Sequence, residues 1–206
     1  MKKLIFEFLQ RILKKGNLQL RKIKLRSMNQ FLKENYGKKE LIGIEIGILA
    51  GENSLEMFEN LNIKKLYLID PYSSYSDYKE TEMNARGQKS LNKYEQSARN
   101  RLKKYNDKIV WVKKFSSDAW KDIKEEVDFV YIDGNHQYEY VKKDIETYYP
   151  LVKKGGVFGG HDYNTYLPME KSMQDYGVVE AVTEFLRRLK QKRKLWFYES
   201  DWWIVK

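Results

Sequence analysis

The chain has 206 residues, no cysteine and a formal net charge of +10. This length fits one domain with a full-sized core, and the lack of cysteine excludes disulfides, thiolate nucleophiles and cysteine-ligated metal sites. A basic chain favours anionic partners, but the lysines are mostly interspersed with glutamates and no known nucleic-acid-binding motif accompanies them, so we attribute most of the charge to solvation of the surface.

Residues 1–40 are predicted to form a helical extension before the main domain. Apolar side chains of residues 4–13 recur at helical spacing, but Glu7, Gln10 and Arg11 interrupt them. This pattern is typical of an amphipathic helix, which can associate weakly with a surface, and it fits neither a membrane span nor a signal peptide. We therefore expect a soluble, cytoplasmic protein.

From residue 41 onward, short apolar runs alternate with amphipathic runs. The apolar runs predict buried strands at Leu41–Ile46, Leu66–Ile69, Ile109–Val112, Val127–Ile132 and Val157–Gly160. Helices are predicted at Ser54–Asn60, Gln88–Tyr105 and Tyr138–Tyr149, and a last helix contains Val178, Val182, Phe185 and Leu189. This alternation is typical of a doubly wound parallel sheet.

The C-terminal region is predicted to form a hairpin. Its strands are Leu195–Tyr198 and Trp202–Val205, and the short link between them can join only antiparallel neighbours. The expected fold class is α/β: a Rossmann-like, doubly wound sheet of seven strands, mostly parallel, with an antiparallel C-terminal hairpin strand and helices on both faces. Residues 41–206 form this domain, and residues 71–86, polar and without periodicity, are predicted to be a lid loop.

Glycines follow the first predicted strand. Gly47 and Gly51 precede a helix and let a ligand approach the backbone closely, although a tight turn between strand and helix has the same pattern. Their spacing differs from the glycine motif that holds the pyrophosphate of dinucleotides. Asp70 ends the second strand, 19 residues after Gly51, where a carboxylate can accept both ribose hydroxyls of an adenosine. Glu45 can face an ammonium group of the same ligand.

The stretch Glu45-x-Gly47-x-x-x-Gly51 resembles the first motif of class I S-adenosylmethionine-dependent methyltransferases. Asp70 stands at the ribose position of that family, and the terminal antiparallel strand is similar as well. The resemblance covers about residues 35 to 206. It implies S-adenosylmethionine as the cofactor and places Ser117 and Asp118, after the third strand, on the adenine side.

Two longer stretches resemble a bacterial O-methyltransferase group that includes sugar-modifying enzymes of the macrocin O-methyltransferase type. They are residues 131–138, YIDGNHQY, and residues 150–163, PLVKKGGVFGGHDY. This resemblance implies that Asp133 and Asp162 bind a divalent cation such as Mg²⁺ and that His136 is the general base. Asp133 also borders the cofactor, and His161, which stands where the sugar enzymes have an acidic residue, is a candidate further metal ligand.

The predicted topology places the same residues together. The carboxyl ends of the fourth and fifth strands open onto one crevice, so two carboxylates and both histidines converge there, although each pair alone fits an ordinary turn or cap. Methyl transfer to an alcohol needs alignment and loss of a proton to a base, or a metal that lowers the hydroxyl pKa. We therefore expect an O-methyltransferase acting on a small-molecule hydroxyl, with a sugar of a glycan or natural product as the acceptor.

Two other classes remain open from the sequence, because this fold hosts many functions. The first is a nicotinamide-dependent oxidoreductase, against which the glycine spacing speaks. The second is a non-catalytic adenosine- or nucleic-acid-binding protein, which would need a continuous basic stripe and a crevice without metal and base. No pattern in the sequence indicates an oligomeric state.

Overall fold

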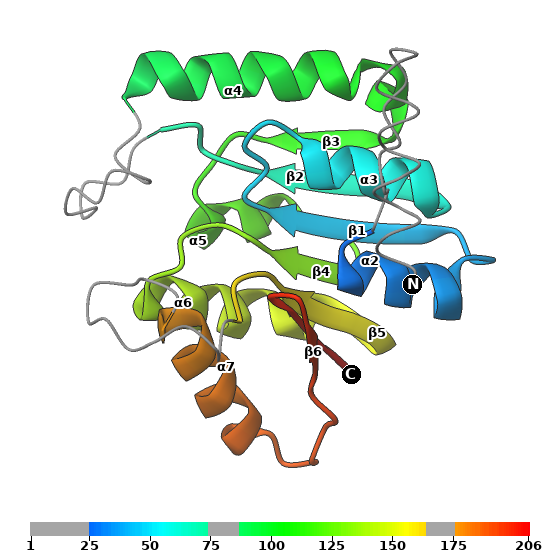
Figure 1. Ribbon diagram of the computed structural model, residues 1–206, viewed down its shortest axis with the longest axis vertical. Coiled ribbons are helices and arrows are strands. Elements are labelled where there is room, and N and C mark those ends of the chain that lie inside the picture. The colour runs from blue at the N-terminus through cyan, green and yellow to red at the C-terminus, as the bar shows by residue number, and fades with distance from the viewer. Residues whose placement is uncertain (1–24, 74–86, 164–175) are drawn as a thin grey trace, which may run out of the picture.

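The computed structural model describes residues 25–73, 87–163 and 176–206. In these residues a seven-stranded sheet has the order β3-β2-β1-β4-β5-β7-β6 (Figure 1). The strands are β1 Leu41–Ile46, β2 Ile63–Ile69, β3 Ile109–Val112, β4 Val127–Ile132, β5 Val152–Gly160, β6 Trp196–Tyr198 and β7 Asp201–Val205. The first five strands pair in parallel, and β7 is antiparallel to both β5 and β6. The predicted fold class is confirmed.

Helices cover both faces of the sheet. One face carries α2 Ser27–Tyr36, α3 Glu52–Asn60 and α4 Gln88–Arg101, and the other carries α5 Ser116–Ala119, α6 Tyr138–Tyr148 and α7 Tyr176–Arg188. Short 3-10 helices lie at Lys103–Lys108, Trp120–Asp122 and Tyr149–Leu151. The central strands have two buried faces: Phe129 and Tyr131 of β4 belong to one core cluster, and Val130 and Ile132 to the other. This explains their continuous apolar sequences.

The strand order places a crevice beside the carboxyl end of β1. The chain runs outward from β1 through β2 to β3 and then returns to β4 on the other side of β1. The segments after β1 and β4 therefore lead to helices on opposite faces, α3 and α6. Such a switch in strand order is where doubly wound sheets bind ligands.

Several element boundaries differ from the sequence prediction; β2, for example, begins at Ile63 rather than Leu66. The two largest differences are in β5 and α4. β5 begins at Val152 rather than Val157, because residues 152–156 continue the strand through an irregularity in its pairing with β4. Backbone bonds between this stretch and Lys206 support it, as expected for a bulged strand. The helix expected to reach Tyr105 ends at Arg101, and a 3-10 helix follows.

The predicted N-terminal extension is described only from residue 25 onward. Its helix α2 packs against α3, β5 and β7, with the side chains of Met28 and Leu32 fully buried. Residues 1–24 and most of the predicted lid loop lie outside the described residues. Within the described ranges, no helix combines the length and apolar character needed to cross a bilayer.

Candidate functional site

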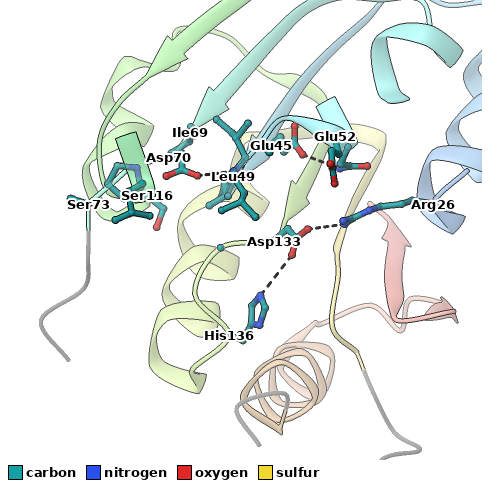
Figure 2. Close-up of a pocket in the computed structure, with 18 residues that line it drawn as sticks. Arg26, Glu45, Leu49, Glu52, Ile69, Asp70, Ser73, Ser116, Asp133 and His136 are labelled. Atoms are coloured by element: carbon teal, nitrogen blue, oxygen red, sulfur yellow. Dashed lines mark hydrogen bonds and ion pairs between the residues drawn. The ribbon is translucent and has the colours of Figure 1, made fainter. Parts of the chain in front are cut away.

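A cavity of about 260 Å³ lies at the carboxyl ends of β1, β2 and β4 (Figure 2). Its wall is formed by residues 45–50 of β1 and the loop after it, by Glu52 and Asn53, by residues 69–71 and Ser73 at the end of β2, by Asp133, Gly134 and His136 after β4, and by Arg26, Leu91 and Ser116. Figure 2 shows Asp70 and Ser116 at one end of this cavity and Arg26 with Asp133 at the other.

The loop after β1 depends on its two glycines. Gly47 has φ +83° and Gly51 has φ +75°, a region that other residues avoid. A Cβ atom on Gly47 would collide with the carbonyl oxygen of Asp133. Only glycine therefore lets this loop pass so close to the end of β4, while Gly51 serves as the left-handed N-cap of α3.

Asp70 ties the β1 loop to the end of β2. Its Oδ2 accepts hydrogen bonds from the backbone N–H groups of Ile48 and Leu49 at 2.9 and 3.0 Å, and its Oδ1 accepts one from Tyr72 at 2.8 Å. A carboxylate has about four acceptor positions, and these three bonds leave about one of them for a ligand hydroxyl. Asp70 borders the cavity, as the ribose prediction requires.

Glu45 borders the cavity but is itself buried, with 1% exposure. Its carboxylate accepts hydrogen bonds from Asn53 Nδ2 at 3.0 Å and from the Ser54 hydroxyl, both on α3. Burial raises the pKa of Glu45 to about 7, although these two bonds oppose the rise. The geometry thus gives Glu45 a role in fixing α3 to β1. Contact between Glu45 and a ligand ammonium stays a prediction.

On the predicted adenine side, the structure brings Ser116 to the cavity wall. Ser117 and Asp118 are exposed and do not line the cavity, and Asp118 pairs with Lys121 at 2.7 Å. Ser116 forms a hydrogen bond with Asp144, a buried residue of α6. Burial raises the pKa of Asp144 to about 7, although this bond opposes the rise. The available sequence signal was the position of Ser116 at the start of α5.

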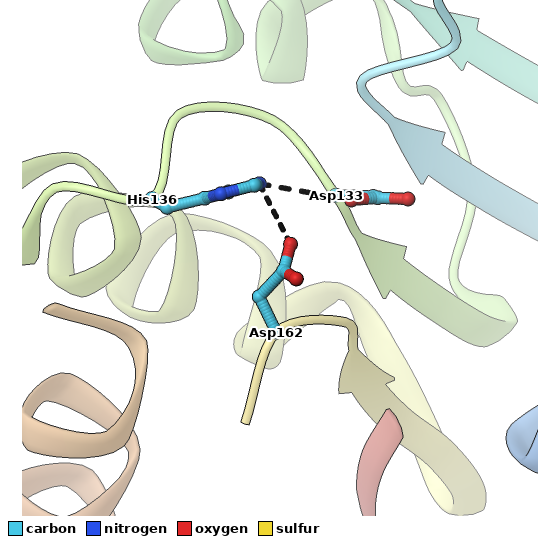
Figure 3. A group of neighbouring side chains, drawn as sticks. All are labelled: Asp133, His136 and Asp162. Atoms are coloured by element: carbon cyan, nitrogen blue, oxygen red, sulfur yellow. Dashed lines mark ion pairs between the residues drawn. The ribbon is translucent and has the colours of Figure 1, made fainter. Parts of the chain in front are cut away.

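Three predicted residues form a compact cluster at the ends of β4 and β5 (Figure 3). His136 Nε2 lies 3.0 Å from Asp162 Oδ2 and 3.7 Å from Asp133 Oδ1. One candidate ligand atom from each residue lies within 4.8 Å of the others. The parallel pairing of β4 with β5, which aligns Ile132 with Gly160, brings the two aspartates to the same edge of the sheet.

The cluster holds a positive charge between its carboxylates. Burial alone would lower the pKa of His136, but hydrogen bonds and charges from Asp133 and Asp162 raise it to about 10. Burial raises the pKa of Asp162, and the stronger opposing effect of His136 and His161 brings it far below its usual range. In the absence of another cation, the imidazole of His136 is therefore protonated at neutral pH.

His161 lies next to Asp162, outside this cluster of three residues. Its Nδ1 is 3.1 Å from Asp162 Oδ1, and its Nε2 is 3.9 Å from Asp201 Oδ1. The structure thus groups His136, rather than His161, with the two aspartates as a possible metal site. In this position the imidazole of His161 contacts the Asp162 carboxylate and can fix its orientation.

Three residues at the site were missed by the sequence reasoning: Arg26, Tyr131 and Asp201. Nη1 of Arg26 donates hydrogen bonds to the Tyr131 hydroxyl at 2.8 Å and to Asp133 Oδ2 at 2.7 Å. The Tyr131 hydroxyl in turn donates to Asp201 Oδ1 at 2.6 Å. Burial favours a lower pKa for Arg26, but Tyr131 and Asp133 raise it above its ordinary value. The only sequence signal was an acidic residue, Asp201, at the start of an apolar strand.

Comparisons with known proteins agree with this fold. The profile of a family described as "Methyltransferase domain" matches residues 44–163. An uncharacterized protein of Acanthamoeba polyphaga mimivirus is 29% identical over 143 residues, which cover 66% of this chain and 57% of that protein. The chain therefore spans less than two thirds of the length of this relative.

Solved structures with the same fold include proteins with different named activities. An O-methyltransferase from Bacillus cereus in complex with SAH has a TM-score of 0.60 at 14% identity, covering 97% of this chain and 90% of that one. An rRNA methylase from Streptococcus thermophilus has a TM-score of 0.58 at 13% identity, covering 91% of this chain and 96% of that one. At such low identity these likenesses show the fold alone.

Proposed function

The chain belongs to the methyltransferase-domain family, and from this premise we propose that it moves the methyl group of S-adenosylmethionine to a hydroxyl oxygen of a small molecule. The acceptor class we propose is a sugar of a glycan or natural product. One observation carries the proposal: a single cavity extends from Asp70 and Ser116 at one end, along the glycine loop, to Asp133 and His136 at the other. A nucleoside can bind at the first end while an acceptor hydroxyl meets acid-base groups at the second.

The cofactor assignment is supported by the residues of the first end. The β1 loop approaches β4 closely through Gly47, and Asp70 offers a carboxylate to the ribose hydroxyls. Ser116 lies on the adenine side, near Ser117 and Asp118. When bound there, S-adenosylmethionine would supply a methyl group on a positively charged sulfur, and this sulfur would leave as a neutral thioether.

The protein has two tasks at the second end, alignment of the acceptor and removal of its proton. We propose His136 as the general base, acting through Nε2, and Asp133 and Asp162 as ligands of a divalent cation, with His161 as a further ligand or the group that orients Asp162. The donor set fits such an ion: the two carboxylates suit Mg²⁺ or Mn²⁺, and an added imidazole ligand from His161 would favour a softer metal. The positive charge of such a cation would lower the pKa of His136, so that the imidazole can lose its proton. The cation would also lower the pKa of a nearby hydroxyl.

Methyl-transfer assays with sugars, phenols and RNA as acceptors test this proposal. Chelation with EDTA should strongly reduce turnover but leave the affinity for S-adenosylmethionine unchanged, because the cation lies on the acceptor side. The His136→Ala variant should reduce kcat by about 10²- to 10⁴-fold, the usual contribution of a general base. Glu59→Gln, a change of a half-exposed residue on α3, is the control and should retain full activity.

The outcomes separate the parts of the proposal. Full activity with EDTA rejects the metal, and full activity in His136→Ala rejects the base. RNA is the second candidate acceptor, because a chain with a net charge of +10 favours anionic partners. Methyl transfer to RNA with none to sugars or phenols would replace the small-molecule acceptor.

A further inference from the structure

The side chain of Arg26 lines the cavity, yet Arg26 lies outside every motif recognised in the sequence. We propose that Arg26 binds the carboxylate at the amino-acid end of the cofactor, an inference that rests on the proposed use of S-adenosylmethionine. The side chain is 32% exposed, extends from the segment before α2, and points toward Asp133 (Figure 2).

The layout of the cavity places the amino-acid end of the cofactor near Arg26. Asp70 and Ser116, assigned to the ribose and the adenine, lie at one end, whereas Arg26, Glu45 and Asp133 lie toward the other (Figure 2). The cofactor is an elongated molecule with adenosine at one end and an amino acid at the other. Once its ribose lies on Asp70, its amino-acid group therefore extends toward Arg26.

Charge complementarity supports the same assignment. The amino-acid group carries one ammonium and one carboxylate, and the cavity wall offers Glu45, Glu52 and Asp133 as acidic partners for the ammonium. Among the described residues that line the cavity, only Arg26 and His136 can carry positive charge, and His136 lies between Asp133 and Asp162. Unless a positively charged side chain offsets their charge, the acidic residues at this end of the cavity would repel a ligand carboxylate. Arg26 is the group that can offset this repulsion.

The guanidinium of Arg26 has N–H donors that make no hydrogen bond to the described residues. Its bonds to other described side chains, Tyr131 and Asp133, are both made by Nη1. A guanidinium has five N–H donors, so those on Nη2 and Nε can form the bidentate contact that arginine makes with carboxylates.

The position of the guanidinium is fixed from several sides. The backbone N–H of Arg26 donates to Glu56 at 2.8 Å. Tyr131, which accepts from Nη1, is itself held by Asp201, and Asp201 also accepts from the backbone N–H of Met28 at 2.8 Å. A side chain held in place before the ligand arrives loses less entropy on binding.

The test compares S-adenosylmethionine with its decarboxylated form, which keeps the adenosine, the sulfonium and the ammonium. Binding of both ligands to the full chain is measured by calorimetry for the wild type, Arg26→Gln, Arg26→Lys and the control Arg188→Gln, an exposed residue of α7. The wild type and the control should bind the carboxylated ligand about 10- to 100-fold more tightly, as charged hydrogen bonds predict. Arg26→Gln should lose this preference without binding the decarboxylated ligand more weakly, and Arg26→Lys should retain part of it.

The results that overturn the inference are distinct. An equal loss of affinity for both ligands in Arg26→Gln assigns Arg26 a purely structural role, and an unchanged preference places the carboxylate elsewhere. If Arg26→Gln unfolds, Arg26→Lys decides by the same two criteria. If the wild type binds neither ligand, the proposed function itself fails, and the inference fails with it.

Discussion

Asp70 has two roles in the site, because it holds the β1 loop through backbone N–H groups and faces the cavity where a ribose is expected. Asp70→Asn keeps the size of the side chain but removes its charge and half of its acceptor capacity. Affinity for S-adenosylhomocysteine, measured by calorimetry, should fall by about 10- to 100-fold. Asp122→Asn, which changes an exposed residue paired with Lys114, should leave this affinity unchanged. Equal affinities of the wild type and Asp70→Asn would remove Asp70 from the binding site.

His136 makes the stability of the metal-free protein depend on pH. Its pKa rises from an ordinary 6.5 to about 10 in the folded chain, so the folded state binds the proton more tightly than the unfolded state. The resulting stabilisation is fully present below pH 6.5 and is lost as the pH rises through about 10. In EDTA, the difference in the free energy of unfolding between the wild type and His136→Gln should therefore shrink from neutral to alkaline pH. A constant difference would show that His136 is not protonated between the two aspartates.

For helices and strands, the sequence predicted correctly the features that depend on the local pattern of apolar and polar residues. The runs that form β1 and β4 are apolar because both faces of these strands are buried, and this signal placed Asp133 at a strand end. The early start of β5 was not predictable, because its bulged stretch pairs with the backbone of Lys206.

The residues missed at the site depend on long-range packing. Arg26 reaches Asp133 only because α2 packs against α3, β5 and β7. Asp201 meets Tyr131 only because β7 pairs with β5, which in turn pairs with β4. Neither contact leaves a pattern of spacing in the sequence. The sequence therefore predicted the site residues at the strand ends, but not the residues that distant segments bring to the site.

The β1 loop offers a second test at this scale. Gly47→Ala should destabilise the fold and weaken cofactor binding, because a methyl group there meets the Asp133 carbonyl in a backbone conformation that alanine avoids. Gly155→Ala is the matched control, since Gly155 also has positive φ, at +79°, but its Cβ position is open. Thermal unfolding should show a cost of about 1 kcal/mol for the control and a clearly larger one for Gly47→Ala. Equal costs would mean that the close approach to β4 is not required.

The chain as a whole is basic, but most of the charged residues around the cavity are acidic. The net charge is +10, yet the cavity and its edge carry Glu45, Glu52, Asp70, Asp133 and Asp162. Binding a cationic sulfonium and a divalent ion at this concentration of carboxylates is electrostatically favourable. The same site is closed by segments from both ends of the described chain, since Arg26 and Asp201 meet through Tyr131.

Calorimetric titration of the full chain with S-adenosylmethionine and, separately, with NAD tests most directly whether this protein uses S-adenosylmethionine. We predict that S-adenosylmethionine binds at one site per chain, that S-adenosylhomocysteine displaces it, and that NAD does not bind, because the spacing of Gly47 and Gly51 differs from the pyrophosphate-binding motif. Binding of NAD together with no detectable heat from S-adenosylmethionine would contradict the assignment.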